Sequence, residues 1–346
     1  MVRPAPKTVP KAVTIAEVAE VAGVSYQTVS RVVNRHQNVA PNTRELVQRV
    51  IEDLGYRPNS FARSLVTRRS HRVGLITLGA SYYGPAQTIT SVETALREDG
   101  YTLLFATLSA PKLEELHSLI EQLLSQAVDG LVLITPLIGV PVRHIKKLCG
   151  NVPFLLLDAE AAEAPALEIN QRQGAQLAAE HLIDLGHTHI AEISGPLHWW
   201  DARQRHEGLL GVLTERGLTL QGSVEGTWEA ESGYHAVKTL LGRETDFTAL
   251  IVGNDQMALG AMRALRENGL HVPHDVSVIG FDNLPETAYY EPPLSSVLQN
   301  FAALGRQCAD LIVALMQGEA LPKYDLLTPT LVPRESTAPP STRSKS

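Results

Sequence analysis

The sequence lacks any apolar run that approaches the roughly 20 residues a membrane helix needs. Its first eleven residues, Met1 to Lys11, mix Pro, Lys and Arg and contain no apolar run of the kind a secretion signal needs. We therefore expect a protein that is neither exported nor anchored, that has no membrane partner, and that works in the cytoplasm.

Cysteine is scarce as well. The 346 residues include only 2 Cys, Cys149 and Cys308, and neither has a second Cys or a His at metal-ligand spacing. This excludes a disulfide framework and a structural zinc site, and it suits a reducing compartment. We predict two buried free thiols.

Motifs of enzyme chemistry are also missing. The sequence has no Gly-x-Ser-x-Gly elbow, no Walker loop and no metal-binding His pair at helical spacing. The pair His187 and His189 stands at a loop-to-strand transition without further ligands, so we interpret it as structural. The sequence therefore predicts no enzymatic activity, no cofactor and no metal.

Positive charge is scarce overall but unevenly placed. The net charge is -7, yet the residues up to Arg72 hold 12 Lys and Arg against 5 Asp and Glu, which leaves 18 basic and 32 acidic residues for the remainder. A short basic segment joined to a long acidic one is expected when only the first part contacts phosphate. The length also predicts at least two folded domains.

The basic segment has the pattern of a helix-turn-helix. Apolar residues from Ile15 to Ala22 recur at helical spacing, Gly23 can make a left-handed turn, and Ser25 can cap a second helix from Tyr26 to about Asn34. A third helix is expected from Pro41 to Leu54, stopped by Gly55.

The second helix exposes side chains that can read bases. Gln27 can pair with adenine and Arg31 with guanine, while Tyr26 and Ser30 can reach bases or phosphate. The alternative is an ordinary surface helix, because such residues are common there. The turn and the basic charge favour the reading of DNA.

A short helix is expected after Gly55. Asn59 can cap one or two turns that end near Leu65, and a helix this short is marginal unless something packs on it. Leu65 lies between Arg63, Arg68 and Arg69, as a minor-groove wedge requires. A flexible linker with a buried leucine is the alternative.

From Val73 onward, apolar runs alternate with amphipathic stretches in two successive series. This rhythm is typical of parallel sheets covered by helices on both faces. It predicts two Rossmann-like lobes, with a ligand between them at the carboxyl ends of the strands.

Polar and aromatic side chains gather at those expected strand ends. Carboxylates, an amide and a guanidinium can bridge neighbouring hydroxyls, and indole faces can cover a sugar ring. A single Asp at a strand end is more often a cap or a turn residue, but the convergence of the set favours a polyol pocket. The set comprises Asp158, Asn254, Asp255, Asp282, Asn283, Arg203, Arg205, Trp199, Trp200 and Trp228.

Several separated motifs of the chain form a known combination. The most specific is the run Ala22-Gly-Val-Ser-Tyr-Gln-Thr-Val-Ser-Arg-Val-Val-Asn34. Further motifs are Pro58-Asn59, Gly186-His187, the run from Asn254 to Met262, Gly280-Phe-Asp282 and Pro292-Pro-Leu294. Through these motifs, from Val13 to about Pro333, the chain resembles the lactose-repressor/galactose-repressor (LacI/GalR) family.

The resemblance implies an N-terminal all-α helix-turn-helix headpiece and an α/β body of two Rossmann-like lobes, similar to periplasmic binding proteins. It implies a tail (1–12), a helix-turn-helix domain (13–57) and a hinge helix with linker (58–72). The first lobe is expected at 73–169 and 301–328, the second at 170–300 and 329–335, and a disordered tail at 336–346.

The resemblance also implies a homodimer that represses transcription by binding a pseudo-palindromic operator and that responds to a small-molecule effector between its lobes. Expected DNA contacts are Thr14, Ser25, Tyr26, Gln27, Thr28, Ser30, Arg31, Asn34, Asn38, Asn59 and Leu65. Expected effector contacts are Tyr82, Asp158, Trp199, Trp200, Asp201, Arg205, Trp228, Asn254, Asp282, Gln299 and Phe301. We expect the effector to be a sugar or glycoside.

Two departures from the family pattern matter. Residues 336 to 346 contain two prolines and no leucine, so they cannot form a heptad helix that joins dimers, and we expect no assembly beyond a dimer. Trp199, Trp200 and Asp201 stand where one member of the family has small residues, and Tyr82 and Tyr83 enlarge the facing wall.

Other functions remain open at this point. The same two-lobed body serves as a solute-binding protein for transporters, although the fused helix-turn-helix speaks against that reading. The effector could also be a corepressor, or the protein an activator, because the sign of the coupling depends on which state the ligand prefers.

Overall fold

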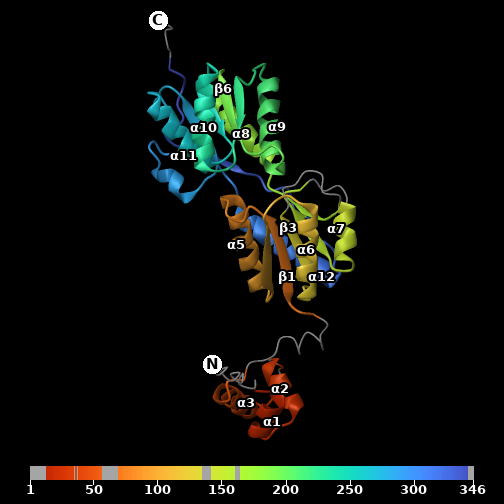
Figure 1. The fold of residues 1–346 in the computed structure, drawn as a ribbon. Coiled ribbons are helices and arrows are strands. Elements are labelled where there is room, and N and C mark those ends of the chain that lie inside the picture. The colour runs from red at the N-terminus through yellow and green to blue at the C-terminus, as the bar shows by residue number, and fades with distance from the viewer. Residues whose placement is uncertain are drawn as a thin grey trace, which may run out of the picture. The chain divides into compact units, whose positions relative to one another are not determined.

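The computed structural model describes residues 13–34, 36, 38–56, 69–134, 142–159 and 164–341. They belong to two compact units, one ending at Ser70 and the other beginning at His71. The first unit contains helices, and the second contains two sheets with their covering helices (Figure 1). No helix in these ranges is long and apolar enough to cross a membrane.

The first unit is the expected headpiece. Its helices are α1 (Ile15–Ala22), α2 (Tyr26–Val33) and α3 (Pro41–Asp53). Thr14 and Glu17 form a capping box at the start of α1, with Thr14 N–H donating to Glu17 Oε2 at 2.6 Å. Gly23 has φ 63°, which a side chain would strain, and the Ser25 hydroxyl accepts from Thr28 N–H at 3.1 Å to cap α2.

One small apolar core holds these helices together. Val18 of α1, Val29 of α2 and Val47 of α3 are completely buried within it. Because the buried face of α2 is fixed by Val29 and Val32, the opposite face must point outward.

The second unit begins with a five-stranded parallel sheet in the order β2-β1-β3-β4-β5. Its strands are almost wholly apolar, as expected when helices cover both faces. The elements of this first lobe are β1 (Arg72–Leu78), α5 (Tyr83–Glu98), β2 (Thr102–Leu108), α6 (Leu113–Ser125), β3 (Gly130–Ile134), α7 (Val142–Cys149), β4 (Phe154–Leu157) and β5 (Ala166–Leu167).

The second lobe is built on a six-stranded sheet in the order β11-β10-β9-β8-β6-β7. All neighbours are parallel except β10 and β11, which are antiparallel. Its elements are α8 (Gln171–Asp184), β6 (Ile190–Ser194), α9 (Trp200–Glu215), β7 (Gly222–Glu225), α10 (Ala230–Gly242), β8 (Ala249–Val252), α11 (Asp255–Glu267), β9 (Ser277–Asp282), η1 (Pro285–Tyr289), β10 (Ser295–Leu298) and β11 (Thr330–Val332).

The chain crosses between the two sheets three times. It passes from β5 to α8, then from β10 to α12 (Phe301–Gln317), and finally from Leu327 to β11. Helix α12 packs against α5 and β3, so in Figure 1 it lies, in blue, among the orange and yellow elements of the first lobe. A β-bridge between Ile169 and Leu327 joins the first and third crossings.

The segment after β11 is packed against the second sheet. The Ser336 side chain is completely buried, its hydroxyl donates to Val278 O at 2.6 Å, and it accepts from Ser295 N–H at 2.8 Å. The expectation of a disordered tail from residue 336 is therefore wrong for residues 336–341. Here a small hydroxyl side chain forms hydrogen bonds with backbone groups of neighbouring strands. A prediction based on apolar residues does not detect such a contact.

Both cysteines and His187, the first histidine of the His pair, are buried in the fold. Cys149 and Cys308 are buried free thiols, as predicted, and burial raises the pKa of Cys149 to about 11. His187 is buried, with its Nδ1 2.9 Å from the Thr248 hydroxyl and its Nε2 2.8 Å from Ala338 O. The described residues contain no cluster of His, Cys, Asp or Glu suited to a metal.

Candidate DNA-reading helix and effector cavity

The outer face of α2 carries the residues expected to read DNA. Tyr26 is 58% exposed, and Gln27, Arg31 and Asn34 are exposed beside it. Ser30 lies on the same helix, with its hydroxyl accepting from Asn34 Nδ2 at 3.4 Å. An exposed helix face with amide, guanidinium and phenol groups has the chemistry needed for base edges in a major groove.

A hollow in the headpiece surface brings further predicted contacts together. Ser25, Thr28, Arg31 and Asn38 line it. Thr14 and Ser25 also cap helices, so their side chains fix the starts of α1 and α2. The predicted contacts Asn59 and Leu65 lie outside the described residues.

In the body, residues from both lobes line one cavity. Ten of the eleven expected effector residues are among them: Tyr82, Asp158, Trp199, Asp201, Arg205, Trp228, Asn254, Asp282, Gln299 and Phe301. They come from strand ends and helix starts that are far apart in the sequence. The parallel sheets bring these ends together, as ligand sites in open α/β folds require.

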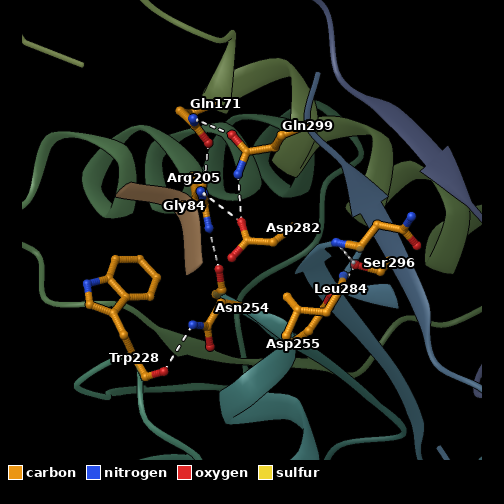
Figure 2. A network of polar contacts seen from close by, with 12 residues as sticks. Gly84, Gln171, Arg205, Trp228, Asn254, Asp255, Asp282, Leu284, Ser296 and Gln299 are labelled. Carbon is orange, nitrogen blue, oxygen red and sulfur yellow. Dashed lines mark hydrogen bonds and ion pairs between the residues drawn. The ribbon is translucent and has the colours of Figure 1, made fainter. Parts of the chain in front are cut away.

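Four of the polar side chains form a closed ring of interactions, here called the polar ring (Figure 2). Gln171 Nε2 donates to Gln299 Oε1 at 2.8 Å, and Gln299 Nε2 donates to Asp282 Oδ1 at 2.6 Å. Arg205 lies 3.6 Å from the same Asp282 oxygen through one terminal nitrogen, and its Nε donates to Gln171 Oε1 at 2.9 Å. A further Arg205 nitrogen donates to Gly253 O. The guanidinium is thus fixed by internal partners.

The pKa values of the carboxyl groups in the cavity are raised. Burial raises the pKa of Asp282 to about 6, against the opposing effect of Arg205. Burial, with the charges of Asp201 and Glu168, raises the pKa of Asp158 to about 8. Burial also raises the pKa of Asp201. The ionised form of these carboxyl groups is therefore unfavourable in the cavity.

Asn254 and Trp228 support each other at the edge of the cavity. Asn254 caps α11 by accepting from Met257 N–H at 2.8 Å, and its Nδ2 donates to Trp228 O at 3.0 Å. Trp228 has φ 72°, a conformation that few residues other than glycine adopt. Asp158 and Asp282 in the same lining also have positive φ, so strained backbone gathers at this site.

Asp255 lies behind the cavity rather than in its lining. Its Oδ1 accepts from the Ser296 hydroxyl at 2.6 Å, and its Oδ2 accepts from Leu284 N–H at 2.8 Å. Burial and the charge of Asp282 raise the pKa of Asp255 to about 8. Its contacts fix the loop after β9.

Aromatic rings form the apolar wall. Trp199 packs edge-on against Trp228 with ring centroids 5.9 Å apart, and Tyr82 packs against Trp199 at 5.8 Å. On the first lobe Tyr83 contacts Phe301 at 6.1 Å. Trp199 is 7% exposed and Trp228 5% exposed, so both indoles are already largely packed.

Comparisons with known proteins identify the fold and the headpiece. Residues 14–59 match the "Bacterial regulatory proteins, lacI family" domain, and residues 179–337 match the "Periplasmic binding protein-like domain". The chain is 36% identical to the lactose operon repressor of Escherichia coli, with 97% of this chain and 94% of that protein aligned. The chain belongs to the LacI family.

The chain is also similar to other transcriptional regulators. The chain is also 36% identical to the HTH-type transcriptional repressor PurR of Haemophilus influenzae, over 93% of this chain and 98% of that protein. Among solved structures, the lac repressor dimer bound to operator and the anti-inducer ONPF matches with a TM-score of 0.89 and 36% identity, covering 95% of this chain and 100% of that one. A complex of transcriptional regulator CelR with cellobiose matches with a TM-score of 0.70 and 32% identity, covering 94% and 99%.

LacI-family membership confirms several expectations. The helix-turn-helix headpiece and the two-lobed α/β body are those of the family, and the chain is a DNA-binding repressor with an effector domain. Its relatives are transcriptional repressors, which confirms that it is not an enzyme.

Trp200 is the one expected effector residue that does not line the cavity. Its indole Nε1 donates to Glu168 at 2.8 Å instead. Trp200 is the first residue of α9, and its neighbour Trp199 faces the cavity. Trp199 is the N-cap of α9 and has extended backbone, whereas Trp200 is helical, so the change of backbone conformation between them points the two indoles in different directions.

Several lining residues carry no recognisable signal in the sequence. Gln171 closes the polar ring, and no motif marks it, although it begins the helix that follows a crossing between the lobes. The other unpredicted lining residues are small or apolar: Gly84, Pro85, Thr88, Ile134 and Ile169.

Proposed function

We propose that this repressor controls its operator through a small carbohydrate that binds in the cavity between the lobes. The observation that carries the proposal is the composition of the lining. Carboxylates, an amide and a guanidinium stand beside two indoles. Such groups suit the hydroxyls and the apolar face of a sugar ring.

The headpiece supports sequence-specific DNA binding. Tyr26, Gln27 and Arg31 project from one exposed helix face, where they can reach base edges. Thr14, Ser25, Thr28 and Asn38 would contact phosphate around them.

We further propose a homodimer that addresses a pseudo-palindromic operator in the cytoplasm. A single helix-turn-helix covers too little surface for regulatory affinity, and two copies would read half-sites about one helical turn apart. The similar lac repressor structure is described as a dimer bound to operator.

Control of the operator is proposed to pass through the crossings. Gln171 and Gln299 each lie beside a crossing, and both belong to the polar ring that lines the cavity. A ligand that changes the polar ring would therefore change how one lobe is held against the other. Strand β1, which follows the hinge segment in the chain, belongs to the first lobe and would carry that change.

Titration of labelled operator in the presence of a panel of mono- and oligosaccharides tests the proposal. A saccharide that weakens operator binding supports an inducer, and one that strengthens it supports a carbohydrate corepressor. Because the comparisons do not identify the effector, purines and amino acids belong in the panel. If only a purine or an amino acid changes operator binding, the proposal of a carbohydrate effector is wrong.

A further inference from the structure

One charged pair lies in the layer between the second sheet and its covering helices. Glu192 of β6 is 4% exposed, beside Leu209, and its Oε2 lies 2.7 Å from His206 Nδ1 of α9. The Ser223 hydroxyl of the neighbouring strand β7 donates to the same oxygen at 2.8 Å. A buried carboxylate is costly unless it is paired and hydrogen-bonded, so His206 is the group that stabilises the ionised form of Glu192.

The charges around His206 favour its protonated form. The hydrogen bond to Glu192, together with the charges of Glu192 and Glu207, raises the pKa of His206 above its usual value of 6.5, against the effect of burial. Glu207 itself pairs with Arg172 of α8, and Ser223 of β7 brings a hydroxyl without charge. The pair is therefore fully charged below pH 6.5 and loses its positive member as the pH rises through the raised pKa of His206.

The residue before His206 reaches into the effector cavity. Arg205 lines that cavity and also lines a small internal pocket beside Glu192. Its guanidinium donates to Gln171 and faces Asp282, so it is engaged away from Glu192 (Figure 2). The position of α9 on β6 therefore decides where Arg205 enters the polar ring.

Helices α8 and α9 are packed so closely that a displacement of one reaches the other. A Cβ on Gly208 of α9 would lie 2.4 Å from Arg172 O of α8, and the Arg172 side chain pairs with Glu207 of α9. Helix α8 begins with Gln171. A shift of α9 against β6 would therefore move two members of the polar ring, Arg205 and Gln171.

We propose that the His206–Glu192 pair is a proton-dependent clamp that holds α9 on β6 and thereby positions Arg205 in the effector cavity. Loss of the proton leaves the buried Glu192 carboxylate without its countercharge, and α9 shifts to let water reach it. His206 and Glu192 are positioning residues, since neither is among the described residues that line the cavity. The clamp makes the geometry of the cavity depend on pH, whichever ligand the cavity binds.

Tryptophan emission of the full chain reports the state of the clamp without any ligand. All 3 tryptophans lie near the start of α9 or beside Arg205. Trp199 caps α9, and Trp200 begins it. The ring centroid of Trp228 lies 5.5 Å from the Arg205 guanidinium carbon. We expect the emission of the wild type to change between pH 6 and pH 9, as His206 loses its proton.

Two substitutions should each remove most of this change by a different route. His206→Lys keeps a positive charge beside Glu192 at both pH values. Glu192→Gln removes the buried charge, so that none is left uncompensated at pH 9. Each variant should show less than half of the wild-type change. Asp158 and Asp282 also titrate in this range, with pKa values of about 8 and about 6, but every variant retains them.

His117→Gln is the matched control. His117 forms the same kind of pair with Glu121 on α6, at 3.2 Å, but both side chains are exposed. This variant should keep the full wild-type change. Circular dichroism at both pH values shows whether each variant is folded, and if only one of the two clamp variants is folded, that one decides.

Two results overturn the inference. Wild-type emission that stays the same between pH 6 and pH 9 shows that deprotonation of His206 does not reach the cavity. A folded His206→Lys or Glu192→Gln variant that keeps more than half of the wild-type change assigns the change to other groups. Neither result bears on the carbohydrate effector, because the measurement contains no ligand.

Discussion

Gln171 and Gln299 are joined by a 2.8 Å hydrogen bond, although 128 positions separate them in the chain. Gln171 begins the helix after the first crossing between the lobes, and Gln299 lies just before α12, which follows the second. Because Gln299 also donates to Asp282, one side chain connects two crossings with the cavity. The Gln299 side chain therefore contacts both the cavity lining and the segments that connect the two lobes.

Removing that connection should destabilise the body. In Gln299→Ala the buried Gln171 Nε2 loses its acceptor, and the buried Asp282 Oδ1 loses the donor that Gln299 supplies. We expect this to lower the free energy of unfolding by about 1–3 kcal/mol. Urea unfolding followed by circular dichroism measures the change. Gln221→Ala is the control, because the Gln221 side chain is exposed and donates to the nearby Thr219 O, so its effect should stay within about 0.5 kcal/mol. Equal losses for both would show that the polar ring adds nothing.

The buried carboxyl groups predict how stability depends on pH. The pKa of Asp158 is raised from 3.8 to about 8, so the folded state holds a proton there that the unfolded state releases. This contribution is fully present below pH 4 and is lost as the pH rises toward 8. Asp158→Asn should therefore raise the melting temperature at pH 8 and leave it nearly unchanged at pH 4. A stabilisation of equal size at both values would contradict the raised pKa.

One glycine of α11 and one of α9 predict opposite effects of substitution by alanine. A Cβ on Gly260 would lie 1.7 Å from Ala230 O, so Gly260→Ala must separate the two helices and should cost 1–3 kcal/mol or more. Gly211, inside α9, has open space around it. Gly211→Ala should stabilise by about 0.5–1 kcal/mol, because alanine favours the helix. Thermal unfolding measures the stability of both variants. A loss of stability in both would contradict the predicted difference.

Base reading predicts a loss that depends on the DNA sequence. Arg31→Ala should weaken binding to the cognate operator by about 1–3 kcal/mol and to random DNA much less. Arg49→Ala, which removes an exposed arginine from α3, should affect the two DNAs equally. Gel-shift titrations on both sequences provide the comparison. Equal losses for Arg31→Ala would reduce that side chain to a phosphate contact.

Local chemistry made much of the fold predictable. Gly23 and Ser25 mark the turn of the headpiece because each satisfies a backbone requirement within a few residues. The apolar strands of the two sheets are equally local signals, and their carboxyl ends indicate where Asp158, Asn254 and Asp282 meet.

What the sequence analysis missed depends on tertiary partners. Gln171 belongs to the site only because Gln299 comes within hydrogen-bond distance. Trp200 was misplaced because the start of α9, and hence the direction of each indole, is set by packing. Ser336 is ordered by the strands that it contacts, which its own neighbours in the sequence do not reveal.

The central claim is that a carbohydrate in the cavity controls operator affinity. The most direct measurement compares the wild type with Asp282→Ala in operator titrations with and without an active saccharide. Asp282 lies in the second unit and not in the headpiece, so the variant keeps the residues proposed to contact DNA and should still bind operator without sugar. It should lose the response to sugar. A variant that keeps the full response, or a wild type that no saccharide affects, would contradict the account.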